Sequence, residues 1–247
     1  MIEDYNEYHF TLKEYMRYIL QGEVIAVLIG WLFFRSIIGI IFLSPLVYWY
    51  CKDRRKNLVK KRKWQLNLEF RDGIGSLSAA LGAGYSAEHA IEEALKDMAL
   101  LYHKESIISR EFTYLINQIK MNITVEKALS DFGERTGIED IISFAEVFTT
   151  AKRTGGDLIH VIRNTSNTIS DKIEVKREII TLITAKKYEA NIMKIIPLGI
   201  ICYMSLSSPG FLDPLYNNIL GAAIMSVLLG IYLGTYLLID KIVAIEI

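Results

Sequence analysis

Residues 153–164 read RTGGDLIHVIRN: two glycines and an aspartate, followed by an apolar pattern. Gly155 lets a helix end with positive φ, and Gly156 permits a tight reversal of the chain. Asp157 is a residue type that caps a new helix, because its carboxylate accepts a hydrogen bond from an early backbone N–H. The apolar residues that follow share the spacing of one helix face: Leu158, Val161 and Ile162. The stretch therefore predicts the end of one helix and the start of another.

The same residues have a catalytic alternative, the Gly-x-Gly-Asp pattern of intramembrane aspartyl peptidases. Thr154 occupies the position that needs the first glycine of this pattern, and the stretch lies outside any long apolar run. We therefore interpret Gly155 and Gly156 as an interhelical turn and Asp157 as a helix cap.

Two earlier stretches, YSAEHAI at 85–91 and ITVEKAL at 123–129, repeat this arrangement. Ser86 and Thr124 occupy the place of Asp157, and both residue types accept a capping hydrogen bond from the first helical turn. A glutamate follows each of them in that turn, where the helix dipole favours negative charge. We therefore predict helix caps at all three positions.

The apolar residues between these joints recur at spacings of three and four, which is the period of an α-helix. No proline lies between Pro45 and Pro197, and no alternating β-branched run indicates a strand. The chain is therefore predicted to be all-α. Its predicted helices in this region lie near 64–81, 86–101, 105–120, 125–135, 139–153 and from 157 onward.

Two apolar segments near the C-terminus predict a transmembrane hairpin. Residues 219–239 carry no charge over about the 20 residues that a bilayer span requires. Residues 192–208 form the second segment, and Lys194 is close enough to its start to reach the membrane surface. The connection PGFLDPLYNN at 209–218 contains no Lys or Arg, which places it outside the cytoplasm.

The N-terminal apolar region, residues 18–50, is interrupted by Arg35. It forms either one long helix, with the charge at the bilayer centre at a cost of about 2.5–3.5 kcal/mol, or a hairpin. The hairpin has arms at roughly 17–34 and 36–51 and turns at Arg35, and aromatic residues at 48–50 mark its membrane interface. We prefer the hairpin.

A basic block, KDRRKNLVKKRK at 52–63, carries eight Lys or Arg residues against one Asp. Such a block can bind nucleic acid, but directly after an apolar run it is typical of the cytoplasmic flank of a membrane span. The predicted organisation is therefore an N-terminal segment with a membrane hairpin at 1–51, a cytoplasmic helical bundle at 52–191, and a C-terminal transmembrane hairpin with a short cytoplasmic tail at 192–247.

The sequence contains no pattern that is typical of catalysis or cofactor binding. There is no P-loop, the four histidines form no His-x-x-x-His pair, and Cys51 and Cys202 form no Cys-x-x-Cys pair. We predict no catalytic residue, no cofactor and no metal site. The acidic pairs at 92–93 and 139–140 leave open the binding of a cation or of a basic partner.

The order and spacing of these segments resemble the type II secretion system F-domain family, the platform proteins of type IV pilus-like machines, and especially its TadB-type members of tight-adherence pili. The resemblance rests on WQLNLEFRDGIGSLSAALGAGYSAEHAIEEAL at 64–95, NITVEKAL at 122–129, RTGGDLIHVIRNTSNTI at 153–169, the apolar hairpin and the tail KIVAIEI at 241–247. It implies a six-helix cytoplasmic bundle without catalytic activity, anchored by flanking membrane helices. Gly155 and Gly156 match the glycine turn of the family, and Gly82 and Gly84 match its first interhelical turn.

The resemblance also implies a location and partners. Such a platform sits beneath a growing pilus in the bacterial cytoplasmic membrane and engages a hexameric secretion ATPase in the cytoplasm. It couples the motion of the ATPase to the extraction of pilin subunits from the lipid bilayer, and it binds no nucleic acid. Because this chain carries one copy of the bundle, the resemblance implies self-association or pairing with a TadC-type paralogue.

Two other function classes compete with a platform. A membrane-bound enzyme, for instance a peptidase, needs a polar constellation in or beside the spans, and the only candidates are Glu23, Arg35 and Lys194. A membrane-anchored helical signalling adaptor is the second competitor, since it has the same composition. A neighbouring secretion ATPase and small pilin-like proteins would favour the platform.

Overall fold

The computed structural model is helical and contains no strand in the part of the chain that it describes, so the all-α prediction is confirmed. The described residues are 5–8, 10–36, 43–154, 158–208, 210–216 and 218–243. They form two compact units, each built from two stretches of the chain. The first unit comprises Met1–His9 and Arg55–Val175, and the second comprises Phe10–Arg54 and Lys176–Ile247.

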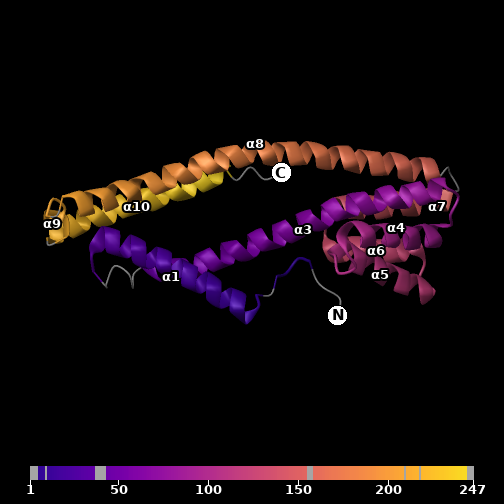
Figure 1. Cartoon of the computed structure of the whole chain (residues 1–247), viewed down its shortest axis with the longest axis horizontal. Helices are drawn as coiled ribbons and strands as arrows, with labels where there is room; N and C mark the ends of the chain where they lie inside the picture. The colour runs from indigo at the N-terminus through magenta and orange to yellow at the C-terminus, as the bar shows by residue number, and fades with distance from the viewer. Residues whose placement is uncertain are drawn as a thin grey trace. The chain divides into compact units, whose positions relative to one another are not determined.

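The first unit is a helical bundle whose elements can be followed in Figure 1. α3 (Pro45–Gly82) and α8 (Leu158–Ser207) each contribute one part of their length to it. Connections of a few residues make the helices between them successively antiparallel. These helices are α4 (Ala87–Tyr102), α5 (Ile107–Lys120), α6 (Val125–Thr136) and α7 (Glu139–Thr154), each within two residues of its predicted bounds.

α3 begins well before the helix predicted at 64–81, because the basic block at 52–63 is itself helical. Lys and Arg are good helix formers, and no glycine or proline interrupts the block. The proline at the start of α3, Pro45, is favoured in the first turn, where its missing N–H removes no helical hydrogen bond. The helix therefore runs without a break from the apolar residues of the second unit into the bundle.

The core of the bundle contains phenylalanines from three helices. The ring of Phe70 in α3 lies edge-on to the rings of Phe132 in α6 and Phe144 in α7, with centroid distances of 5.9 and 5.6 Å. Phe148 extends the cluster along α7, 6.3 Å from Phe144. All four side chains are fully buried. Aromatic pairs in this geometry add stability beyond the area they bury, so this cluster holds α3 against the α6–α7 hairpin.

The predicted helix caps differ in detail. Ser86 is the N-cap residue of α4, and its hydroxyl accepts a hydrogen bond from the backbone N–H of His89 at 3.3 Å. Thr124 stands at the N-cap position of α6, but its side chain accepts no capping hydrogen bond. Its hydroxyl interacts instead with the carboxylate of Glu126, which competes for the same group. Asp157 lies outside the described residues.

The predicted glycine turns also divide. Gly82 is the last residue of α3, and Gly84 in the following turn has a φ of +90°. Gly84 is therefore the position in this turn where the absence of a Cβ relieves backbone strain. Gly155 and Gly156 lie outside the described residues.

Gly73 marks a close approach of α3 to α5, and we expect Gly73→Ala to destabilise the bundle by about 1–3 kcal/mol. A Cβ at this position would lie 2.8 Å from Cζ of Phe112, whose ring is buried. Gly75 is exposed and has nothing within 4 Å of such a Cβ. Gly75→Ala should therefore stabilise the protein by about 0.5–1 kcal/mol, because alanine is the better helix former. Denaturant titration of the full-length protein in detergent measures both variants, and effects of the same sign would contradict the close approach.

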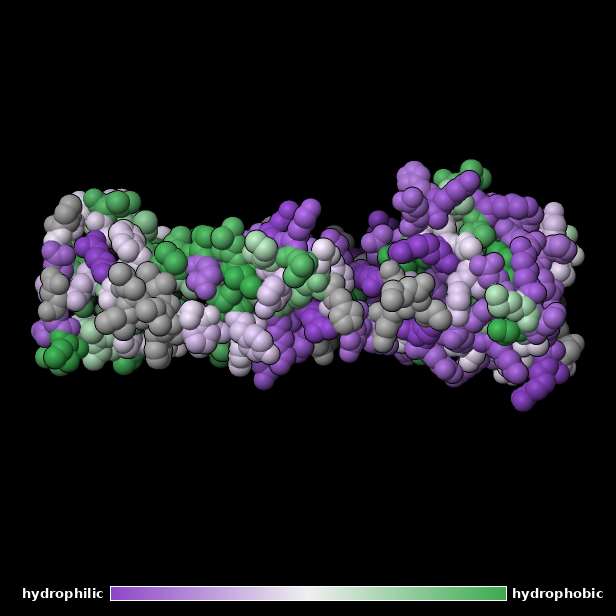
Figure 2. All heavy atoms as spheres, turned by 90° about the horizontal axis from the view of Figure 1, so that it is seen from below, coloured by the Kyte–Doolittle hydropathy of each residue, from purple (hydrophilic) through white to green (hydrophobic). Residues whose placement is uncertain are grey.

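The second unit carries the apolar helices. Three helices are long and apolar enough to cross a membrane, within the described part of the chain. They are α1 (Leu12–Phe34), α8, and α10 (Ile219–Val243) over Ile219–Ile242. The short α9 (Asp213–Tyr216) precedes α10. Figure 2 shows hydrophobic side chains gathered along this unit, whereas the surface of the bundle is mostly hydrophilic.

The N-terminal apolar region is not one continuous helix. α1 ends at Phe34, and Arg35 is its C-cap residue with a left-handed φ of +43°. α3 returns beside α1, since a Cβ on Gly22 would lie 2.8 Å from Cγ1 of Val47. This arrangement agrees with a turn at Arg35 and not with a single helix through it. The second predicted arm, 36–51, does not appear as a fourth helix of membrane-spanning length, and its residues 37–42 lie outside the described ranges.

Candidate functional site

The first candidate site is the anchorage of α8 in the bundle. Four residues on one face of α8, at successive spacings of four, three and four, are no more than 5% exposed: Ile162, Ser166, Ile169 and Ile173. Most other side chains of α8 between 159 and 175 are exposed. This single buried stripe attaches the first four turns of a 50-residue helix, and it ends where the helix leaves the bundle unit.

A polar junction closes this stripe at Lys172. The ammonium group of Lys172 in α8 lies 2.7 Å from Oδ1 of Asp140 and 3.6 Å from Oε2 of Glu139, both in α7. Nδ2 of Asn67 in α3 donates to the other oxygen of Asp140 at 2.8 Å. The hydrogen bond with Asp140 raises the pKa of Lys172, although burial acts against it. Lys172 therefore remains charged, and the junction joins α3, α7 and α8.

This junction answers one question that the sequence left open. The acidic pair at 139–140 does hold a cation, but the cation is the side chain of Lys172. The other acidic pair, at 92–93, is also engaged: Glu92 with His89 at 3.2 Å, and Glu93 with Lys96 at 2.7 Å. Among the described residues, no group of three or more His, Cys, Asp or Glu side chains is placed to hold a metal ion.

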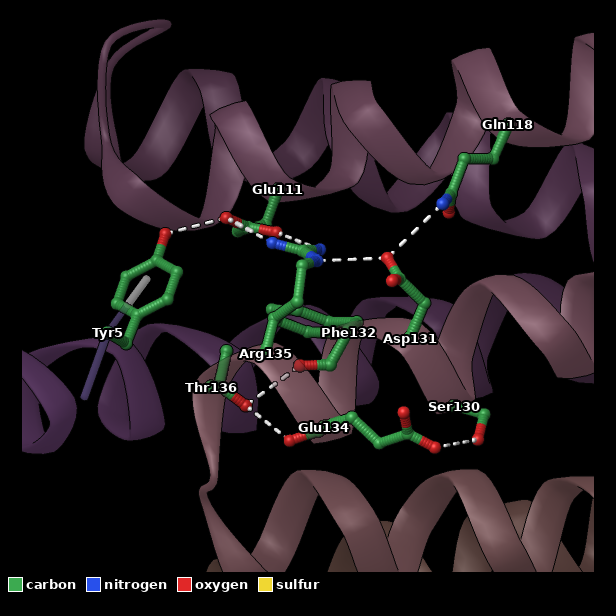
Figure 3. A network of polar contacts seen from close by, with 10 residues as sticks. Tyr5, Glu111, Gln118, Ser130, Asp131, Phe132, Glu134, Arg135 and Thr136 are labelled. Atoms are coloured by element: carbon green, nitrogen blue, oxygen red, sulfur yellow. Dashed lines mark hydrogen bonds and ion pairs between the residues drawn. The ribbon is translucent and has the colours of Figure 1, made fainter. Parts of the chain in front are cut away.

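The second candidate site is a charged network between α5 and α6 (Figure 3). Arg135 contacts Glu111 through two nitrogens, at 2.7 and 3.3 Å, and its Nε donates to Asp131 at 2.9 Å. Gln118 donates to the same oxygen of Asp131 at 3.2 Å. The side chain of Glu111 is 8% exposed and that of Arg135 is 14% exposed.

Arg135 keeps its charge in this network. Burial lowers the pKa of its guanidinium, but the hydrogen bonds from Glu111 and Asp131 outweigh burial and raise the pKa above its ordinary value. The guanidinium carbon also lies 4.8 Å from the ring centroid of Tyr114, in the range of a cation–π contact. A buried ion pair of this kind holds two helices in one relative orientation, since any other leaves a charge without a partner.

The polar candidates for an enzyme lie apart. Arg35 forms an ion pair with Asp213 at 3.5 Å and lies over the ring of Tyr216, 5.0 Å from its centroid. Lys194 is hydrogen-bonded to Asp240. Arg35 also donates to Ser205, which is eleven residues beyond Lys194 on α8, or about 16 Å along the helix. Glu23 is half-buried on α1. The structure therefore does not gather these residues into one constellation.

Sequence reasoning missed the two junctions, although one signal was present. Glu111 falls between Ile108 and Phe112 on the buried face of α5. An acidic residue at an apolar position of an amphipathic helix requires a partner when it is buried. This signal points to a buried pair, but it does not identify Arg135 as the partner.

Together, the fold and these junctions define a helical bundle joined by continuous helices to segments of membrane-spanning character. The family model described as type II secretion system (T2SS), protein F, matches residues 74–206, more than half of the chain. The protein therefore belongs to the T2SS protein F family, whose members are non-catalytic membrane platform proteins of secretion or pilus systems. No curated protein and no solved structure matches the chain.

Proposed function

We propose that this protein is the TadB-type platform of a tight-adherence pilus and that it couples a cytoplasmic secretion ATPase to pilus assembly. The family match supports the platform role. The helices of membrane-spanning character support a place in the bacterial cytoplasmic membrane, with the bundle in the cytoplasm beside the basic block. The proposed partners are the ATPase, pilin subunits, the lipid bilayer, and a TadC-type paralogue or a second copy of the chain.

The observation that carries the coupling role is the continuity of α8 (orange in Figure 1). This helix contains the buried stripe that anchors it in the bundle and also an apolar window of membrane-spanning character. Its 50 residues correspond to about 75 Å at 1.5 Å per residue. We propose that α8 carries a displacement of the bundle into the membrane, where pilin is extracted.

The weak helix formers NTSNT at 164–168 do not interrupt α8. The hydroxyls of Thr165 and Thr168 donate to the backbone carbonyls four residues earlier, at 2.9 Å. Ser166 is buried in the contact with the bundle. Packing therefore overrides the low intrinsic propensity of this segment.

A flexible insertion tests the coupling. Seven Gly and Ser residues inserted after Lys186, which is exposed, should abolish piliation but leave the protein folded and inserted in the membrane. The matched control is a seven-residue insertion of Ala, Glu and Lys, about two helical turns, which retains the helix and nearly its register. We expect the control to keep a substantial part of piliation. Normal piliation in the flexible variant would show that a stiff α8 is unnecessary.

Isolation of the complex tests the partners. Purification of the tagged protein in mild detergent should retain a secretion ATPase and pilin subunits, which mass spectrometry identifies. Recovery of a membrane enzyme system or a signalling complex in their place would contradict the platform proposal.

A further inference from the structure

The N-terminal segment lies against the bundle and forms part of the first unit. Tyr5 is 1% exposed, and its hydroxyl donates to Oε1 of Glu111 at 2.7 Å (Figure 3). The guanidinium carbon of Arg62 lies 4.6 Å from the centroid of the Tyr5 ring. The ring is therefore enclosed beside a cation of α3, and its hydroxyl extends the network of Glu111 and Arg135.

The next two residues continue the contact with α3. Oδ1 of Asn6 accepts a hydrogen bond from Nζ of Lys63 at 2.7 Å. Glu7 forms an ion pair with Arg55 at 3.8 Å, and both side chains are substantially exposed. Three consecutive residues thus meet three basic side chains of α3, and the sign of the charges is complementary.

Gly137, in the turn between α6 and α7, provides the space for this segment. It has a φ of +56°, and a Cβ at this position would lie 3.0 Å from Oδ1 of Asn6. Any other residue would be strained in this conformation and would press against the segment. The turn is therefore fitted to the docked peptide as well as to the reversal of the chain.

We propose that Glu111, Arg135, Gly137 and the basic face of α3 form a binding site for a tyrosine-led acidic peptide, and that its occupant is the N-terminal segment of the same chain. A buried tyrosine supplies the hydroxyl donor for Glu111, and the acidic residue two positions later meets Arg55. Only a few residues separate Tyr5 from the start of α1 at Leu12. Occupancy of the site therefore ties the beginning of α1 to α5 and α6, in addition to the covalent connections through α3 and α8.

Hydrogen exchange of the full-length protein in detergent tests the docked state. Tyr5→Ala should increase amide exchange in residues 107–116 and 131–137, and Tyr5→Phe should have a smaller effect because it keeps the buried ring. Exchange in α4 serves as the internal control for global unfolding. Unchanged exchange at 107–116 in Tyr5→Ala would overturn the proposal.

Addition of a peptide separates a binding site from a merely structural contact. A synthetic peptide of residues 1–10 should bind the full-length Tyr5→Ala protein saturably and restore protection at 107–116. The peptide with phenylalanine at position 5 should bind about tenfold more weakly, since it lacks one hydrogen bond to a charged group. Arg62→Ala in the Tyr5→Ala protein should weaken binding of the unmodified peptide. Failure of the peptide to bind or to restore protection would overturn the proposal.

The source of the segment is tested by dilution. If the occupant belongs to the same chain, protection of 107–116 in the wild-type protein is independent of protein concentration, and added peptide does not bind. Protection that falls on dilution would assign the segment to a second copy of the chain and overturn the intramolecular assignment.

Discussion

Replacement of Arg135 by alanine should lower the free energy of unfolding of the bundle by about 3–5 kcal/mol, because it leaves a buried carboxylate without its cation. The side chain of Glu111 is 8% exposed and accepts two contacts from Arg135. Asp131 loses its partner in the same substitution. Denaturant titration of the full-length protein, followed by circular dichroism in detergent, measures the change.

An exposed ion pair is the matched control for this prediction. Lys152 and Glu126 lie 3.1 Å apart, with side chains 37% and 24% exposed, and such pairs contribute up to about 1 kcal/mol. Lys152→Ala should therefore have a small effect. Arg135→Lys should fall between the two, since one ammonium group cannot reproduce the two-pronged contact with Glu111. If Arg135→Ala cost no more than Lys152→Ala, the ion pair with Glu111 would not be a buried one in solution.

Replacement of Phe144 by alanine should also cost about 3–5 kcal/mol, because it leaves a cavity that the packed core closes only in part. Phe144 is 0% exposed, and its ring contacts Phe70 and Phe148. The loss loosens the attachment of α3 to α7, so thermal unfolding should begin in the bundle. Tryptophan fluorescence reports this through Trp64, which packs against the same core.

Leu100→Ala is the control for Phe144→Ala, because the side chain of Leu100 is 84% exposed. It removes a similar kind of apolar side chain but leaves no cavity, and its effect should lie within about 0.5 kcal/mol of zero. A comparable loss of stability in both variants would show that Phe144 is not in a packed core.

Local signals in the sequence predicted most of the fold. The helix bounds follow from the apolar period and from residues such as Ser86, whose capping bond involves an N–H three residues away. The end of α1 at Arg35 also agrees with the preferred hairpin. The candidate functional residues were harder to predict, because Lys172 and Asp140 are 32 positions apart and Arg135 and Glu111 are 24 apart.

The sequence by itself determined the all-α class, the bounds of the bundle helices and the apolar segments, because these depend on interactions within a few turns of one helix. Only the tertiary structure decided which helix faces meet. It distinguished Gly73, which contacts Phe112, from Gly75, which contacts nothing, although the two are equivalent in composition. It also placed Tyr5 against Glu111, a residue 106 positions away. A periodic pattern shows that a face is buried, but the partner depends on packing and charge complementarity between helices, which no local pattern encodes.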